Sequence, residues 1–139
     1  GSDGKGLYST GLGHGDAMHA SDLDPARPGL EVFAIHENPK HPHGTDLRDA
    51  RTGEILWSKP SSEVGRGLAA DIDPRHPGYE CWASGNGLRG LWNIKGGQIS
   101  ERKPRSCNFK NAPRAAAGHQ RPFPKVGKPN LSCYFELSE

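Results

Sequence analysis

Apolar residues occur in short runs separated by glycine, proline and acidic residues, a pattern that predicts short β-strands joined by turns. Two of these runs are rich in bulky apolar residues, and each follows an acidic loop. Two turns begin with Asp49 or Asn93 and end with glycine, which tolerates the positive φ that a hairpin requires. The predicted strands are residues 30–35, 46–48 and 54–57 in the first half and 79–83, 90–92 and 98–100 in the second.

The two halves of this pattern repeat one another. The carboxylates Asp22, Asp24 and Glu31 recur 49 residues later as Asp71, Asp73 and Glu80. The repeat units cover about residues 11–58 and 59–109, and short strands at this period are typical of propeller blades. We therefore predict an all-β partial β-propeller of about two blades. Because a closed propeller has about four to eight blades, the missing blades of a parent protein are expected partners.

Composition supports a chain with many turns and few helices. Only 32% of the 139 residues are apolar, with 19 Gly and 12 Pro. Residues 110–139 have no strand period and more basic than acidic residues, which predicts an irregular or disordered tail. The net charge of +2 gives no support for nucleic-acid binding, and no apolar run approaches the roughly 20 residues of a membrane helix.

The cysteines form an odd set without a closely spaced pair. Cys81, Cys107 and Cys133 are therefore predicted to be buried or free thiols rather than metal ligands. One disulfide with one free thiol is the alternative in a secreted protein. The chain does not begin with Met, so the lack of a visible signal peptide leaves the compartment open.

The two acidic loops have the chemistry of calcium ligands. Ca²⁺ takes six to eight oxygens from carboxylates, carbonyls and water. Alternatively, the aspartates accept backbone hydrogen bonds in Asx turns, and Pro25 and Pro74 interrupt the EF-hand spacing. The repetition favours calcium. The candidate ligands are Asp22, Asp24 and Glu31 in the first loop and Asp71, Asp73 and Glu80 in the second.

A second candidate metal site is the glycine-rich segment 11–19 with the residues that follow the first apolar strand. His14, Asp16 and Glu37 form a mixed nitrogen and oxygen set, which also suits zinc or manganese. Hydrogen-bonded turn residues are the alternative. The histidines His36, His41 and His43 have loose metal-like spacing near a proline-rich insertion, and we expect them to be solvated.

Arg66 lies between two glycines, which leave it accessible to a carboxylate ligand. An ordinary surface arginine is the alternative. Trp57, Trp82 and Trp92 fall in or near predicted strands and are expected to be core residues rather than sugar platforms. The motifs of serine hydrolases, zinc proteases, phosphate loops and dinucleotide-binding folds do not occur.

Residues 7–17, 21–37, 49–54 and 65–84 together resemble the rhamnogalacturonan lyases of polysaccharide lyase family 11. The resemblance extends over about residues 4–109 and implies an eight-bladed, calcium-containing β-propeller that is secreted. It implies cleavage of the rhamnose–galacturonate bond of pectin rhamnogalacturonan I by β-elimination. It also implies that His14, Asp16 and Glu37 bind calcium near the cleft, and that Arg66 is the catalytic and substrate-binding residue.

After Phe109 the sequence departs from the family pattern. We therefore expect residues 1–109 to be a partial lyase domain and residues 110–139 to be an unrelated tail. About two of eight blades are expected, so the chain is interpreted as a fragment of a calcium-dependent lyase, too short to be active alone. The alternative is a non-catalytic, calcium-stabilised β-repeat that binds carbohydrate or other chains.

Overall fold

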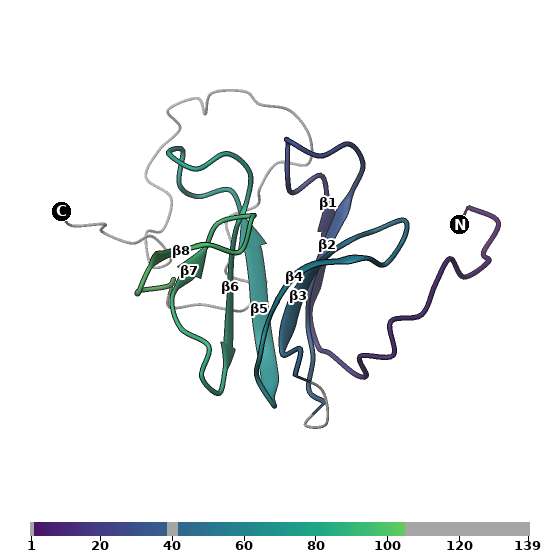
Figure 1. Ribbon diagram of the computed structural model, residues 1–139, viewed down its shortest axis with the longest axis horizontal. Coiled ribbons are helices and arrows are strands. Elements are labelled where there is room, and N and C mark those ends of the chain that lie inside the picture. The colour runs from purple at the N-terminus through teal and green to yellow at the C-terminus, as the bar shows by residue number, and fades with distance from the viewer. Residues whose placement is uncertain (1, 39–41, 105–139) are drawn as a thin grey trace, which may run out of the picture.

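The computed structural model describes residues 2–38 and 42–104, which form two four-stranded antiparallel sheets that lie side by side (Figure 1). The described residues contain no helix, so the all-β prediction is confirmed. In each sheet every strand pairs with its neighbour in sequence. The strands of the first sheet are β1 (Met18–Ser21), β2 (Glu31–Ile35), β3 (Thr45–Asp49) and β4 (Ile55–Lys59). Those of the second are β5 (Val64–Ala70), β6 (Glu80–Gly85), β7 (Leu91–Trp92) and β8 (Gln98–Ser100).

The predicted apolar strands are the centres of the two sheets. Every residue of β2 is buried, and Phe33 of β2 pairs with Leu47 of β3. In the second sheet Leu68 of β5 pairs with Trp82 of β6. The main core lies between the two sheets, where apolar side chains from both pack together and are buried from water. Its buried members include Leu23, Phe33, Ile35, Leu47, Val64, Ala69, Cys81, Ala83, Trp92 and Ile94.

Strands β1 and β5 were not among the predicted strands, and glycines interrupt the apolar pattern of β5. In the structure β5 lies between the rest of the second sheet and the first sheet (Figure 1). A Cβ atom at Gly67 would lie 2.5 Å from Cγ2 of Ile35. Glycine is therefore needed at this position so that β5 can approach β2 closely.

Trp57 of β4 also connects the two sheets. Its Nε1 donates a 2.8 Å hydrogen bond to the carbonyl of Ile94, and its ring lies 6.0 Å from Phe33 and 6.2 Å from Trp92. Such aromatic pairs add about 0.5–1.5 kcal/mol beyond the area that they bury. Trp82 and Trp92 are fully buried. The tryptophans are therefore core residues, as predicted.

The two hairpin turns form as the sequence predicts. Oδ1 of Asp49 accepts hydrogen bonds from the backbone of Arg51 and Thr52, at 2.9 and 2.8 Å. These bonds lower the pKa of Asp49. Asn93 has the same role in the second sheet, and Gly53 and Gly96 have positive φ.

Several predictions concern residues outside the described ranges. The tail beyond residue 104, Cys107, Cys133 and His41 belong to this group. Cys81 is a buried free thiol, and burial raises its pKa well above the usual value. Among the described residues, no helix is long and apolar enough to cross a membrane.

Candidate functional site

The structure brings His14, Asp16 and Glu37 together although 23 positions of sequence separate the first from the last. One ligand atom from each lies within 4.8 Å of the others. Nε2 of His14 is 3.0 Å from Oδ1 of Asp16 and 3.9 Å from Oε2 of Glu37. All three side chains are at least partly open to solvent. Within residues 2–38 and 42–104, no other three histidine, cysteine or acidic side chains meet in this way.

Backbone contacts fix the segment that carries His14 and Asp16 against the end of β2. The N–H of Glu37 donates to the carbonyl of His14 at 2.9 Å, and the N–H of Ile35 donates to the carbonyl of Ala17 at 3.3 Å. A Cβ atom at Gly15 would lie 1.8 Å from the carbonyl oxygen of Ile35. The approach is therefore possible only with glycine at position 15.

Arg66 reaches the same cluster from β5. Its Nη1 donates to Oδ2 of Asp16 at 2.7 Å and to the carbonyl of Gly65 at 2.6 Å. The hydrogen bond from Arg66, followed by the one with His14, lowers the pKa of Asp16, which therefore stays ionised at neutral pH. The Arg66 side chain is 55% exposed and can still meet a ligand from solvent.

The two carboxylates of the donor set and the spacing of all three ligand atoms fit Ca²⁺, whereas the imidazole nitrogen is also a ligand of zinc and other transition metals. Ca²⁺ binds oxygen ligands at about 2.3–2.6 Å, so two ligands of one ion are separated by up to about 5 Å. The three ligand atoms of His14, Asp16 and Glu37 satisfy this limit. Their solvent exposure leaves room for the water molecules that complete a calcium shell. Two carboxylates and one imidazole can therefore hold Ca²⁺ here.

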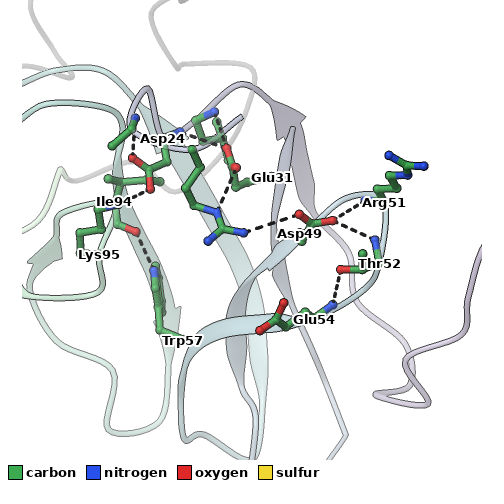
Figure 2. Close-up of polar contacts among 12 residues, drawn as sticks. Asp24, Glu31, Asp49, Arg51, Thr52, Glu54, Trp57, Ile94 and Lys95 are labelled. Atoms are coloured by element: carbon green, nitrogen blue, oxygen red, sulfur yellow. Dashed lines mark hydrogen bonds and ion pairs between the residues drawn. The ribbon is translucent and has the colours of Figure 1, made fainter. Parts of the chain in front are cut away.

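The first acidic loop is held by buried hydrogen bonds (Figure 2). Oε2 of the fully buried Glu31 accepts from the backbone N–H groups of Leu23 and Asp24, both at 3.1 Å. Asp24 accepts from the backbone of Ala26 at 3.1 Å and pairs with Nζ of Lys95 at 2.5 Å. Asp24 thus forms an Asx turn, the alternative that the sequence left open.

The second acidic loop repeats this arrangement. Oε2 of the buried Glu80 accepts from the backbone of Ile72 and Asp73, both at 2.9 Å. Asp73 accepts from the backbone N–H of Arg75, and its Oδ2 lies 2.7 Å from Nη2 of Arg75. This pairing with Arg75 lowers the pKa of Asp73 to about 2. Burial raises the pKa of Glu80, whereas its two backbone donors act in the opposite direction.

The loop aspartates Asp24 and Asp73 and one oxygen of each loop glutamate are therefore bonded to the protein itself, whereas Oε1 of Glu31 and Oε1 of Glu80 are buried without a hydrogen-bond partner. Asp22 and Asp71 are exposed, Asp24 and Asp73 have backbone and side-chain partners, and Glu31 and Glu80 have backbone donors on Oε2. The structure does not gather three of these six carboxylates around one point. Calcium binding by the loops stays a prediction, and the site at His14 is the better candidate.

One histidine prediction is wrong. His36 was expected to be solvated, but it is 4% exposed, and its Nε2 lies 2.5 Å from Oδ2 of Asp46. Arg48 contacts the same oxygen at 3.3 Å. His36 is buried because it directly follows β2, where its N–H bonds to Gly44 and its carbonyl accepts from Val64. His43, partly buried, lies 2.7 Å from Oγ of Ser58 through its Nδ1.

The comparisons with known proteins agree with one another. Residues 1–113 match the family model described as rhamnogalacturonan lyase family 11, C-terminal domain. The chain is 57% identical over 108 residues to rhamnogalacturonan endolyase YesW of Bacillus subtilis, covering 77% of this chain and 17% of that protein. It is 55% identical over 113 residues to rhamnogalacturonan exolyase YesX of the same organism, covering 77% and 18%.

Solved structures give the same result. The crystal structure of YesW superposes with a TM-score of 0.71 at 56% identity, covering 77% of this chain and 18% of that one. The Bacillus licheniformis rhamnogalacturonan lyase PL11 also gives 0.71 at 56% identity, covering 76% and 18%. The chain thus spans less than a fifth of the length of these relatives. Residues 1–113 and this degree of identity place the chain in rhamnogalacturonan lyase family 11.

Proposed function

We propose that this chain supplies the calcium-binding and arginine-bearing part of a rhamnogalacturonan lyase, which cleaves the rhamnose–galacturonate bond of rhamnogalacturonan I by β-elimination. The observation that carries the proposal is the convergence of His14, Asp16 and Glu37 beside Arg66. The relatives named endolyase and exolyase have nearly equal identity to this chain. The proposal therefore concerns the bond cleavage that they share. Because the substrate is a polymer, we propose that the protein is secreted.

The chemistry of β-elimination fits these residues. Removal of the proton at C5 of a uronate leaves negative charge delocalised onto the adjacent carboxylate, so positive charge beside that carboxylate lowers the barrier. The guanidinium of Arg66 can pair with it through two parallel hydrogen bonds. Bound calcium would supply further positive charge at the same place. Strand β5 positions Arg66 at the cluster, and its exposed side chain can meet a polymer.

A non-catalytic role in carbohydrate binding is the second candidate, and one observation favours it. In this proposal His14, Asp16 and Glu37 all serve as ligands of the cation. An elimination also requires a general base within reach of the C5 proton. The cluster leaves no such group, which favours calcium-dependent binding for this chain alone.

Incubation of the full 139-residue chain with rhamnogalacturonan I separates these functions. Retention of the polysaccharide and the ultraviolet absorbance of unsaturated uronates are measured with calcium and with chelator. We expect calcium-dependent retention, reduced at least tenfold by Arg66→Ala, because one charge-assisted pair contributes about 1.5–3 kcal/mol. Unsaturated product that disappears in Arg66→Ala assigns the elimination to this chain. Retention without product assigns binding alone, and neither retention nor product contradicts the proposal.

A further inference from the structure

Asp16 is shared between the proposed cation site and Arg66. Its Oδ1 faces Nε2 of His14 at 3.0 Å, and its Oδ2 faces Nη1 of Arg66 at 2.7 Å. Asp16 offers one carboxylate oxygen to the group of three ligand atoms, so a cation bound there would share this carboxylate with the guanidinium. Two positive charges would then lie on opposite oxygens of one side chain.

Electrostatics makes these two partners antagonists. Like charges a few ångströms apart repel each other, and a partly exposed site screens this repulsion only in part. While Arg66 donates to Oδ2, a metal ion that used both oxygens of Asp16 would have to share Oδ2 with the guanidinium. The exposed Arg66 side chain has room to move away. Its second acceptor, the carbonyl of Gly65, belongs to its own strand and does not tie it to the cluster.

We propose that Arg66 and the bound cation compete for Asp16, so that an anionic ligand which draws Arg66 away strengthens cation binding. The inference rests on the proposed function, because it takes the His14 cluster as the calcium site. It adds a regulatory property of that site, namely that calcium and a carboxylate ligand bind cooperatively. By linkage, the factor by which the carboxylate raises calcium affinity equals the factor by which calcium raises carboxylate affinity.

A uronate is the class of ligand that fits this exchange. Its planar carboxylate can replace that of Asp16 as the bidentate partner of the guanidinium. A neutral sugar of the same shape lacks that charge and leaves Arg66 on Asp16. Galacturonate and galactose are therefore the matched pair of probes.

The test is a calorimetric titration of Ca²⁺ into the full chain, its Arg66→Ala variant and its Arg51→Ala variant, each with and without galacturonate. Arg51 is an exposed arginine of the turn after β3. Strand β3 begins at Thr45, which pairs with Ile35 beside the site, and the turn with Arg51 follows the other end of this strand. Arg51→Ala therefore controls for the loss of net charge.

We expect Arg66→Ala to bind calcium about fivefold to tenfold more tightly than the wild type, within the usual range of coupling between sites. Arg51→Ala should change the affinity by less than about twofold, because exposed charges beyond a Debye length are screened. Galacturonate should tighten calcium binding several-fold in the wild type and not in Arg66→Ala. Galactose should have no effect on either protein. Arg66→Ala in galacturonate also corrects for calcium bound by the sugar itself.

Unchanged or weaker calcium binding by Arg66→Ala overturns the inference, because Arg66 would then be neutral towards the cation or would position Asp16 for it. The calcium site itself would still stand if Asp16→Asn abolished binding in the same titration. If Arg66→Ala binds calcium and the wild type does not, the result supports competition between Arg66 and the cation for Asp16. Calcium binding by neither protein overturns both the site and the inference.

Discussion

Glu31→Ala is expected to lower the free energy of unfolding by about 2–6 kcal/mol, because it leaves two buried backbone N–H groups without an acceptor at about 1–3 kcal/mol each. Glu31 is fully buried, and its Oε2 accepts from Leu23 and Asp24. Domains of this size have a total stability of about 5–15 kcal/mol, so the loss is a large fraction of it. Urea unfolding followed by circular dichroism measures the change.

Two control variants are compared with Glu31→Ala. Glu31→Gln keeps an oxygen acceptor and should cost less than Glu31→Ala. Leu30→Ala removes a neighbouring side chain that is 54% exposed, and should change stability by less than about 0.5 kcal/mol. Equal stabilities of Glu31→Ala and Leu30→Ala would contradict the structural role of Glu31. A loss that appears only when calcium is present would instead support the calcium-ligand prediction for this loop.

Gly15→Ala is expected to weaken calcium binding by about 10–100-fold, as changes that displace metal ligands without removing them do. The new Cβ would clash with the carbonyl of Ile35, at 1.8 Å, so the segment that carries His14 and Asp16 must move away from β2. The substitution removes none of the three ligand side chains. Calorimetric titration with Ca²⁺ checks the affinity, and circular dichroism checks that the sheets remain.

Gly6→Ala is the matched control for this substitution. A Cβ at Gly6 meets nothing within 4 Å, and its φ is outside the left-handed region. Calcium affinity should therefore be unchanged. Wild-type affinity in Gly15→Ala would show that the close approach to Ile35 does not shape the site.

The sequence predicted strands at the main apolar runs and missed β1 and the glycine-containing β5. Strand β2, with Phe33 in its middle, has a clear apolar pattern and was predicted. Strand β5 contains Gly65 and Gly67, which weaken a strand pattern, and only the contact with Ile35 explains why Gly67 belongs in a strand. The packing of the two sheets determines that Gly67 lies in a strand, and the local sequence pattern does not predict it.

The candidate site was predicted in part. The residue types of His14, Asp16 and Glu37 indicate a metal site, and the structure places them together. The partner of Arg66 was not predicted, because Asp16 lies 50 positions away in sequence. The pair of His36 and Asp46 was missed for a similar reason. Asp46 lies beside the end of β2 through the register of β2 and β3, which pairs Ala34 with Asp46.

In the acidic loops, the sequence could not distinguish calcium ligands from turn residues. An aspartate that binds calcium and one that closes an Asx turn occur in the same sequence context. Only the hydrogen bonds distinguish them, and Asp24 and Asp73 both accept the backbone N–H two residues further along the chain. The repetition of the loops therefore reflects a repeated structural role at least as much as a repeated ligand set.

Calcium titration of the wild-type chain and of Asp16→Asn is the most direct test of the proposed calcium site. Asp16→Asn preserves the size of the side chain and removes the charge that both the cation and Arg66 need. We expect saturable binding by the wild-type protein that Asp16→Asn abolishes, while circular dichroism shows both proteins folded. Equal calcium affinity in the two proteins would contradict the assignment of His14, Asp16 and Glu37 as the calcium site.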